Sequence, residues 1–380
     1  MKVMVSAGEV SGDLHGAFLV RELKKTSPDI KFFGLGSDRL KSEGVDIRFD
    51  ISRRSTIGIF EALPNLIPIY LVYLRTIHLM KKEKPDLLLL IDSQGFNIPL
   101  ARAAKKLGIK TVYYIAPQEW LWGTPAGVKK IAETIDLIVA IFEKEYNSYK
   151  NAGGNVVYFG HPLIDIITPS LSRNAARKKY LGAEDKKLLI SLCPGSRTQE
   201  IKNLLPLLVK SALLIGKEFP AAVFFIPAAS DYISNIIPHY MESLEARIIV
   251  GQTHDILFAS DLALCASGTI NLESSVLGVP NIMVYKLSPL TYFIGKNILK
   301  IDKKLPYFSM PNFILNEKVV PELVMGMANP VLIAAEAVSI LKDPSRADYM
   351  KNSFSRLKTL LGQPGVLPKI SQAIIDFLSL

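Results

Sequence analysis

The sequence predicts an α/β protein with two Rossmann-like domains, and three observations support this fold class. Short apolar runs typical of buried strands alternate with longer stretches whose apolar residues recur at helical spacing. Strands that are apolar on both faces are typical of a parallel sheet covered by helices on both sides. The alternation breaks once, at residues 160–165, and then starts again, which divides the 380 residues into two domains of ordinary size.

The first half opens with a strand at Lys2 to Ala7, a glycine-bounded turn at Gly8 to Asp13 and a helix at Leu14 to Lys25. The apolar runs predict further strands at 31–35, 86–91, 110–115, 137–141 and 155–159. Helical spacing predicts helices at 57–80, 98–107, 126–135 and 143–152. We expect this N-terminal domain to span residues 1–165.

The second half repeats the alternation. Its apolar runs predict strands at 188–193, 222–227, 247–250, 261–266 and 280–285, each separated by a helical stretch. The chain is irregular from Pro306 to Glu322 and helical in three runs after that. We therefore expect a C-terminal domain at 166–345, followed by helices at 346–380 that pack back on the first domain or on a partner chain.

The composition favours an anionic partner without naming it. The net charge is +10, which suits a nucleotide, a phosphorylated lipid, a membrane surface or a nucleic acid. The two cysteines, Cys193 and Cys265, lie far apart in apolar runs, so neither a zinc site nor a disulfide framework is predicted and a reducing cytoplasm fits. The N-terminus reads directly into a strand, so we expect no signal peptide.

One apolar segment, residues 57–80, has two interpretations. Four residues that a membrane span avoids interrupt it: Glu61, Pro64, Pro68 and Arg75. A transmembrane helix is therefore not expected. The segment is either a core helix or an apolar patch at a membrane interface, with Lys81, Lys82 and Lys84 as its basic rim.

Polar residues directly after the predicted strands are the first candidates for a site, because ligands of open parallel sheets bind outside the carboxyl ends of the strands. In the first half, Glu9 follows the opening strand and Asp92 follows the apolar strand 86–91. A carboxylate that ends an apolar run is unfavourable unless it faces a polar cleft. An alternative is that Asp92 caps the next helix at Phe96 or Asn97.

The turn at residues 8–13 supports neither NTP hydrolysis nor NAD binding. It lacks the Gly-Lys-Ser/Thr ending of a P-loop and the glycine spacing of a dinucleotide motif. Its plain alternative is a turn with Asp13 as a helix cap. His161, beside Pro162 at the domain joint, is a minor candidate for a general base, because lone histidines are most often ordinary polar residues.

In the second half, Ser267-Gly268-Thr269 joins a buried strand to a helix start, which predicts a nucleotide-diphosphate site. Gly268 lets a phosphate approach the free N–H groups of the helix, and the two hydroxyls add donors. Glu273, one turn into that helix, is placed to accept bonds from two ribose hydroxyls. The alternative is that Ser267 merely caps the helix and Glu273 is a solvated first-turn acid.

Arg197 follows a tight Pro194-Gly195-Ser196 turn and keeps its charge at all physiological pH values. It therefore suits stabilisation of a departing diphosphate where no metal is used. No Asp-x-Asp pair occurs in the chain. A surface salt bridge with Glu200 is the alternative role for Arg197. The polar residues of both halves are expected to face one cleft.

Six stretches, in order along nearly the whole chain, carry a resemblance to a known family. They are Ala7 to Asp13, Ile91 to Asn97, Gly160-His161-Pro162-Leu163, Pro194 to Ile201, Ser267-Gly268-Thr269 with Glu273, and Leu305 to Asn312 with Pro321-Glu322-Leu323. Together they resemble the lipid-A-disaccharide synthases. The resemblance implies a GT-B glycosyltransferase fold, in which two Rossmann-like domains with parallel sheets face one another across a cleft.

The resemblance also implies the reaction. It joins UDP-2,3-diacylglucosamine to 2,3-diacylglucosamine 1-phosphate and gives a β-1,6-linked disaccharide phosphate and UDP, as a step of lipid A synthesis at the cytoplasmic face of the inner membrane. The α-linked donor and β-linked product imply one in-line displacement, with a general base on the acceptor hydroxyl and stabilisation of the leaving UDP. No metal cofactor is expected.

Matched position by position, the resemblance implies Asp92 as the catalytic base, with Glu9 as its nearest competitor, and Arg197 at the departing diphosphate. The donor-binding residues that it implies are Ser196, Arg197, Ser267, Gly268, Thr269, Glu273 and Asn312. The implied partners are the two lipid substrates, an anionic membrane surface contacted through residues 57–84 and possible association as a homodimer, with no nucleic acid.

The chain departs from the family pattern in two places on the acceptor side. Residues 92–97 read Asp-Ser-Gln-Gly-Phe-Asn where the family usually shows Asp-Ala-Pro-Asp-Phe-Asn, so a second carboxylate is missing. Trp120-Leu121-Trp122 stands in place of Trp-Ala-Trp, and the arginine expected soon after is absent near Gly127. Other functions also remain open: a related transferase of peptidoglycan precursors, a UDP-N-acetylglucosamine 2-epimerase, and a non-catalytic protein that binds a nucleotide sugar or a lipid.

Overall fold

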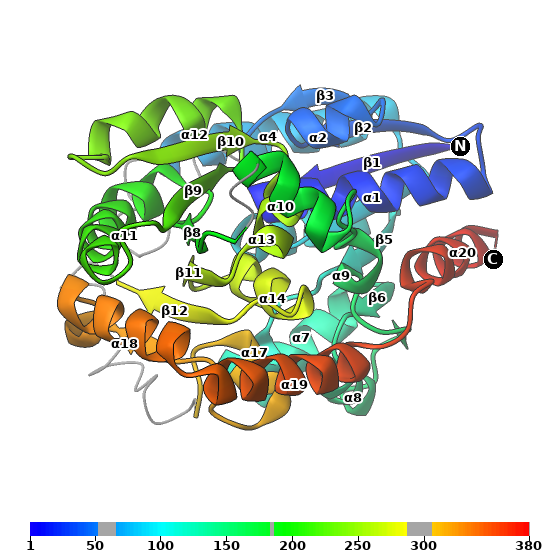
Figure 1. The fold of residues 1–380 in the computed structure, drawn as a ribbon. Coiled ribbons are helices and arrows are strands. Elements are labelled where there is room, and N and C mark those ends of the chain that lie inside the picture. The colour runs from blue at the N-terminus through cyan, green and yellow to red at the C-terminus, as the bar shows by residue number, and fades with distance from the viewer. Residues whose placement is uncertain (52–65, 183–185, 287–305, 380) are drawn as a thin grey trace. The chain divides into compact units, whose positions relative to one another are not determined.

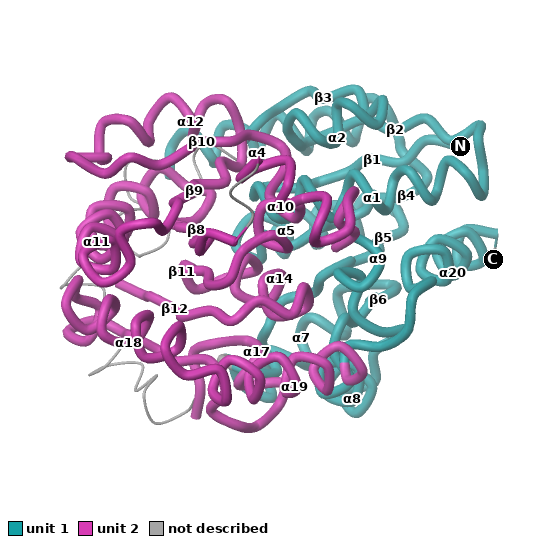
Figure 2. Tube along the Cα trace, in the orientation of Figure 1, with its two compact units in different colours: residues 1–166, 361–380 teal, residues 167–360 magenta. Residues whose placement is uncertain are grey.

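The computed structural model describes residues 1–51, 66–182, 186–286 and 306–379. The described chain divides into two compact units, coloured separately in Figure 2. Unit 1 holds residues 1–166 together with 361–380, and unit 2 holds residues 167–360. Each unit is a parallel sheet with helices, so the predicted class of two Rossmann-like α/β domains is confirmed.

In the described part of unit 1, seven strands form one sheet in which all neighbouring strands run parallel (Figure 1). In sheet order they are β3 (Asp46–Phe49), β2 (Lys31–Leu35), β1 (Lys2–Ala7), β4 (Leu87–Ile91), β5 (Lys110–Tyr114), β6 (Leu137–Ala140) and β7 (Val156–Tyr158). The order reverses between β1 and β4, because the chain first builds outward through β2 and β3 and then returns to the other side of β1. This is the topological switch point of the sheet.

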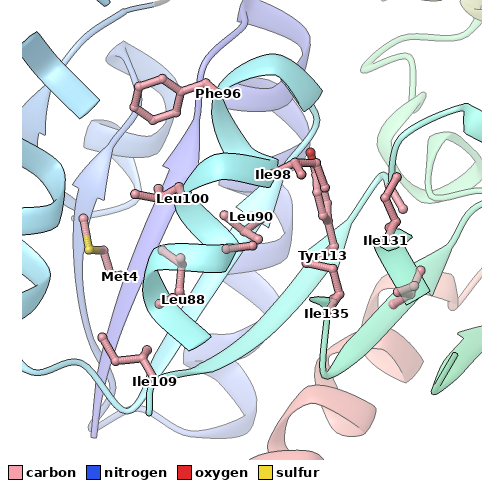
Figure 3. Packing of buried hydrophobic residues seen from close by; sticks show 14 of the residues in the cluster. Met4, Leu88, Leu90, Phe96, Ile98, Leu100, Ile109, Tyr113, Ile131 and Ile135 are labelled. Atoms are coloured by element: carbon pink, nitrogen blue, oxygen red, sulfur yellow. The ribbon is translucent and has the colours of Figure 1, made fainter. Parts of the chain in front are cut away.

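The helices of unit 1 follow the predicted alternation. They are α1 (Val10–Thr26), α2 (Asp38–Ser42), α4 (Leu66–Glu83), α5 (Gln94–Lys106), α6 (Glu119–Trp122), α7 (Pro125–Thr134), α8 (Glu143–Asn151), α9 (Leu163–Ile166) and α20 (Val366–Ser379). Every residue of β4 is buried, as expected for a central strand covered on both faces. On one face Leu88 and Leu90 belong to the same buried cluster as Leu100 of α5, and Figure 3 shows these side chains together.

The last helix, α20, belongs to unit 1 although it is distant in sequence. It packs against α1, where the hydroxyls of Thr26 and Ser371 lie 2.9 Å apart. The carboxylate of Asp165 accepts the backbone N–H groups of Gly365 and Leu367, both at 2.7 Å, at the start of the helix. The C-terminal segment is therefore anchored at both α1 and α9.

In the described part of unit 2, six parallel strands form a second sheet (Figure 1). In sheet order they are β10 (Ala246–Val250), β9 (Val223–Ala228), β8 (Leu189–Cys193), β11 (Leu262–Ala266), β12 (Asn281–Tyr285) and β13 (Glu322–Val324). Its helices are α10 (Arg173–Leu181), α11 (Thr198–Glu218), α12 (Asp231–Ile236), η4 (Ile237–Tyr240), α13 (Thr253–Ala259), α14 (Thr269–Val276), α17 (Met310–Leu315), η5 (Met325–Met327), α18 (Pro330–Lys342) and α19 (Pro344–Leu361). The switch point of this sheet lies between β8 and β11.

The interpretation of Asp13 as the cap of the first long helix is wrong. That helix begins at Val10, with Glu9 as its N-cap residue. The carboxylate of Asp13 instead accepts the N–H groups of Ser37 at 2.6 Å and Arg39 at 3.0 Å, so it caps α2. Burial raises the pKa of this carboxyl, although these hydrogen bonds oppose that effect. Asp13 is therefore a structural residue that joins α1 to α2.

Candidate functional site

The predicted residues of the first half gather at the switch point of the unit 1 sheet. Glu9 follows β1 and Asp92 follows β4, and these two strands are neighbours in the sheet. Both turns are tight. Asp92 and Ser93 each have a φ of +51°. This value lies in the left-handed region, which residues other than glycine rarely adopt. A Cβ at Gly8 would lie 2.4 Å from Oγ of Ser93, so glycine at this position lets the two turns approach.

Buried side chains hold the backbone of Asp92 in this conformation. The amide of Asn97 donates to the carbonyl of Asp92 at 2.7 Å and to that of Ile91 at 3.1 Å. The hydroxyl of Tyr113 donates to the same Asp92 carbonyl at 2.7 Å. Ser6 completes the network by donating its hydroxyl to Oδ1 of Asn97 at 2.6 Å. Fully buried polar groups that are all satisfied fix a backbone rigidly, so the position of the Asp92 side chain is well defined.

The carboxylate of Asp92 is half-buried and points into a polar turn. Its Oδ2 accepts from the hydroxyl of Ser11 at 3.3 Å, and its Oδ1 accepts from the backbone N–H of Ser93 at 2.8 Å. The N–H groups of Phe96 and Asn97 donate to the carbonyl of Ser93, so the first turn of α5 is closed without a cap from Asp92. The carboxylate therefore does not close the first turn of α5 and lies at the edge of the sheet, directly after β4.

Tyr113 connects Asp92 electrostatically with Glu9. Burial raises the pKa of the Tyr113 hydroxyl well above its usual value, and the negative charge of Asp92 adds to the shift, with a smaller contribution from Glu9. The phenol therefore stays protonated and serves as a donor. Glu9 is half-buried, and its extended backbone begins α1. Two carboxylates thus lie near one buried phenol at the switch point.

His161, the minor candidate for a base, is enclosed in the core of unit 1. Burial lowers the pKa of its imidazole to about 3, and the neighbouring His15 adds to this effect. Its Nδ1 accepts from the N–H of Leu163 at 3.1 Å, and its ring lies 5.0 Å from that of Phe142. His161 is therefore a neutral residue that closes the first turn of α9, and it is not exposed to a substrate.

In unit 2 the turn after β8 is folded around Glu200 of α11. Oε2 of Glu200 accepts the backbone N–H groups of Ser196 at 2.9 Å and Arg197 at 3.1 Å, and Oε1 pairs with the Arg197 guanidinium at 2.9 Å. Gly195 has a φ of +111°, and a Cβ there would lie 2.2 Å from Oε2. The salt bridge weighed for Arg197 is present, but it is mostly buried and also shapes the turn.

The turn after β11 leaves the start of α14 open. Gly268 is the N-cap residue with a φ of +150°, and nothing lies within 4 Å of the place where a Cβ would stand. Gly268 and Thr269 are exposed and Ser267 is half-buried. Because β8 and β11 are neighbours, this turn and the Arg197 turn follow adjacent strand ends at the switch point of the sheet.

Glu273 is not the solvated acid of the alternative interpretation, because it is only 6% exposed. Its Oε2 lies 3.2 Å from Nε2 of His254 on α13. The sequence did not single out His254, and no local signal could have done so, since the two residues come from different helices. Among the described residues, no group of three or more His, Cys, Asp or Glu side chains could hold a metal ion.

Comparisons with known proteins decide the family. The model of the family described as lipid-A-disaccharide synthetase matches residues 3–374. The lipid-A-disaccharide synthase of Geobacter metallireducens is 36% identical over 379 residues, which cover 99% of this chain and 97% of that protein. The chain belongs to the lipid-A-disaccharide synthase family. The enzyme of Syntrophus aciditrophicus agrees, with 37% identity over 96% of this chain and 94% of its own.

Membership of the lipid-A-disaccharide synthase family confirms the predicted class of enzyme, a glycosyltransferase of lipid A biosynthesis. Solved structures support the GT-B fold. A putative UDP-N-acetylglucosamine 2-epimerase of Listeria monocytogenes has a TM-score of 0.66 at 13% identity and covers 97% of this chain and 94% of its own. The UDP-GlcNAc 2-epimerase of Neisseria meningitidis bound to UDP-GlcNAc has a TM-score of 0.63 at 15% identity, with both chains covered completely. At such identities the likeness shows the fold alone.

In this member of the family, Asn312 forms its hydrogen bonds within its own segment. Its side-chain amide donates to the carbonyl of Val320 at 2.7 Å and to Glu322 at 2.9 Å, and its oxygen accepts from the N–H groups of Val319 and Val320. Glu322 in turn accepts the N–H of Ser309 at the start of α17. The residue is fully buried, so it fixes the segment from 308 to 322 rather than presenting its amide to solvent.

Next to Gly95, the position of the missing second carboxylate, Gln94 contacts a carboxylate from another element. Gln94, two residues after Asp92, donates its amide to Oε1 of Glu119 at 2.5 Å. Glu119 comes from α6, after β5, and β5 is the neighbour of β4. Glu119 therefore lies after the strand next to β4 and contacts the turn that follows Asp92.

Proposed function

We propose that this chain condenses UDP-2,3-diacylglucosamine with 2,3-diacylglucosamine 1-phosphate and releases UDP and the β-1,6-linked disaccharide 1-phosphate. The observation that carries the proposal is the family match over residues 3–374. The geometry supports it, because the candidate residues of each unit lie at the switch point of its own sheet, where ligands of this fold class bind.

In the proposed reaction Asp92 is the general base. It accepts the proton of the acceptor 6-hydroxyl while that oxygen attacks the anomeric carbon and the bond to the UDP oxygen breaks. Its half-buried carboxylate, held by Ser11 and Ser93 on a rigid turn, supports this role. Glu9 is the competing base, because it follows the neighbouring strand.

The donor is proposed to bind unit 2. The diphosphate lies at the start of α14, where Ser267, Gly268 and Thr269 leave an open turn, and Ser196 contributes from the adjacent turn. Arg197 stabilises the negative charge of the leaving UDP. Because the Arg197 guanidinium pairs with Glu200, the diphosphate has to compete for it.

The remaining donor contacts are proposed for Glu273 and Asn312. Glu273 accepts the ribose hydroxyls from one turn inside α14. Asn312 acts through the segment that it holds, since its amide is already satisfied. No metal is proposed in the reaction, so turnover is expected to survive an excess of EDTA; activity that is lost and returns only with added Mg²⁺ would oppose this part.

One assay tests the function as a whole. The protein is incubated with UDP-diacylglucosamine in the presence and in the absence of diacylglucosamine 1-phosphate, and UDP and the sugar products are measured. The synthase requires both substrates and forms one disaccharide for each UDP. Release of UDP that ignores the acceptor would contradict the proposal, and an epimerised sugar nucleotide would establish the isomerase instead.

Helix α4 supports a proposal about the membrane. One face packs on the core of unit 1 through Ile69, Val72 and Tyr73, so the core-helix interpretation is correct for that face. The other face exposes large apolar side chains to between 44% and 73%: Leu66, Ile67, Tyr70, Leu71 and Leu74. No described helix is long and apolar enough to cross a bilayer. Residues 57–65 of the predicted patch lie outside the described residues.

We infer from this face that unit 1 lies against the cytoplasmic surface of the inner membrane, with the lysines at 81, 82 and 84 near anionic headgroups. Flotation with vesicles containing anionic lipid tests the inference. The double variant Ile67→Ser, Leu71→Ser is expected to float less than wild type. The matched control, Met327→Ser, Val331→Ser, removes two exposed apolar side chains of unit 2 and should float as wild type. Equal flotation of all three proteins would oppose the inference.

A further inference from the structure

Glu273, the proposed ribose contact, is paired with a histidine, His254, that has no role in the proposed binding of the UDP-sugar. The side chain of Glu273 is 8% exposed and that of His254 is 21% exposed, so the pair sits just below the surface of unit 2. His254 lies in the first turn of α13, and α13 packs against α14, which carries Glu273. The two residues therefore meet through packing between helices that flank β11 in the chain.

The imidazole satisfies only part of the hydrogen-bonding capacity of this carboxylate. A carboxylate offers about four acceptor sites on its two oxygens, and His254 uses one of them, on Oε2. No other hydrogen bond to the Glu273 carboxylate comes from the described part of the chain. A nearly buried carboxylate with unused acceptor sites is unfavourable unless a ligand completes it. The vicinal hydroxyls of a ribose are two donors of suitable spacing.

The hydrogen bond from His254 also restricts the rotation of the Glu273 side chain. A glutamate has three side-chain torsions, and ordering a free one on ligand binding reduces affinity. The hydrogen bond from Nε2 of His254 restricts the rotation of the carboxylate before any ligand arrives. Preorganisation of this kind increases affinity for the group that is recognised and not for the rest of the ligand.

We propose that His254 is a positioning residue of the donor site: it holds the Glu273 carboxylate in the orientation that recognises the ribose hydroxyls of a nucleoside diphosphate. The inference rests on the proposed function, because it takes Glu273 as the ribose contact. His254 itself does not touch the nucleotide.

The readout is discrimination between ribose and deoxyribose. Isothermal titration calorimetry measures Kd for UDP and for 2′-deoxy-UDP, and the ratio of the two constants isolates the hydroxyl contact from the phosphate and base contacts. We expect wild type to bind UDP about tenfold more tightly than 2′-deoxy-UDP, and Glu273→Ala to bring the ratio to about one. His254→Ala should reduce the ratio about threefold, and His254→Gln, which keeps a donor amide, should restore most of it.

The variants separate this inference from the function on which it rests. A ratio that falls in Glu273→Ala but stays at the wild-type value in His254→Ala would overturn the role of His254 and leave Glu273 in place. A ratio that is unchanged in Glu273→Ala would instead refute the ribose contact itself. A merely structural histidine would weaken the binding of both nucleotides equally and leave the ratio unchanged, which also counts against the proposal.

A matched control and a second substitution keep the test decisive. His239→Ala removes an exposed histidine from η4 of the same unit and should change neither Kd. If His254→Ala does not fold, as judged by its circular dichroism spectrum, His254→Leu keeps most of the volume and removes the donor. The comparison of Leu with Gln at position 254 then gives the same answer, since only the Gln variant should discriminate between the two nucleotides.

Discussion

The buried His161 makes unit 1 sensitive to acid, and this offers a prediction that also separates structure from catalysis. The imidazole has a pKa of about 3 in the folded protein, against 6.5 for an exposed histidine. Below pH 6.5 the unfolded chain therefore binds a proton that the folded chain does not. Stability attributable to this site is fully present above pH 6.5 and is lost progressively as the pH falls toward 3.

The size of the effect follows from the two pKa values. Each pH unit within this window costs about 1.4 kcal/mol, so lowering the pH from 7 to 5 should cost about 2 kcal/mol through His161. Glu145 acts in the opposite direction, because burial raises the pKa of its carboxyl to about 8. Its contribution to stability is present below pH 4.5 and is lost as the pH rises toward 8. The pH dependence of wild-type stability therefore contains opposite contributions from His161 and Glu145.

A comparison with His161→Gln separates them, since Glu145 is common to both proteins. Urea unfolding is followed by tryptophan fluorescence, because both tryptophans, Trp120 and Trp122, belong to unit 1. The ring of Trp120 lies 5.9 Å from that of Phe142, which in turn contacts His161. The variant should be less stable than wild type at pH 7, and the difference should shrink by about 2 kcal/mol at pH 5.

A difference that stays constant between pH 7 and pH 5 would refute the reasoning, because it would mean that His161 titrates alike in the folded and unfolded chains. Turnover provides the second half of the test. If His161 were the general base, its loss would lower kcat by about two to four orders of magnitude. We expect instead that folded His161→Gln retains a kcat within about threefold of wild type, since the residue faces the core.

Three further predictions concern the proposed site. Asp92→Asn should lower kcat by about two to four orders of magnitude with UDP affinity unchanged, because it removes the base and keeps the turn; a wild-type kcat would move the base elsewhere. Arg197→Ala should lower kcat, and Arg197→Lys should recover only part of it, since lysine lacks the planar fork of donors; full activity in both variants would remove Arg197 from the reaction. Gly195→Ala should lower the melting temperature by about 5 °C, because φ is +111° at this position and Glu200 lies against it; an unchanged thermal transition would contradict the geometry.

The main plan of the fold could be predicted because it depends on local pattern. The central strands such as β4 and β11 are continuous apolar runs, and their periodicity identifies them directly. The two strands that the sequence did not predict, β3 and β13, are short and lie at the edges of their sheets. An edge strand buries less apolar surface, so its residues carry a weaker signal.

The sequence identified residues of the candidate site, but it could not predict which other residues they contact. Asp92 and Arg197 stand out because each places a charged group shortly after an apolar strand, where ligands of this fold class bind. What each touches depends on the fold. Asp13 caps a helix that begins 25 residues later, and Glu273 meets a histidine 19 residues before it. Pairs at such separations have no periodicity, so only the packed structure can bring them together.

The two units differ in how specifically their features indicate a transferase. Any enzyme that holds a UDP-sugar can use an open helix start, an arginine and an acid such as the proposed ribose contact, so the proposed site of unit 2 alone would also suit the epimerases that share this fold. An epimerase acts on one sugar nucleotide and needs no acceptor. The features that we assign to the proposed lipid-linked acceptor belong to unit 1: the Asp92 turn with its Gln94 to Glu119 contact, and the exposed apolar face of α4.

The proposed acceptor chemistry is therefore best tested on unit 1. If Asp92→Asn abolished disaccharide formation while the protein still bound UDP normally, the catalytic group and the donor site would be assigned to different units, in agreement with the proposed mechanism. If UDP binding were lost together with activity, the Asp92 turn would belong to donor recognition, and the case for a transferase would rest on the family match alone.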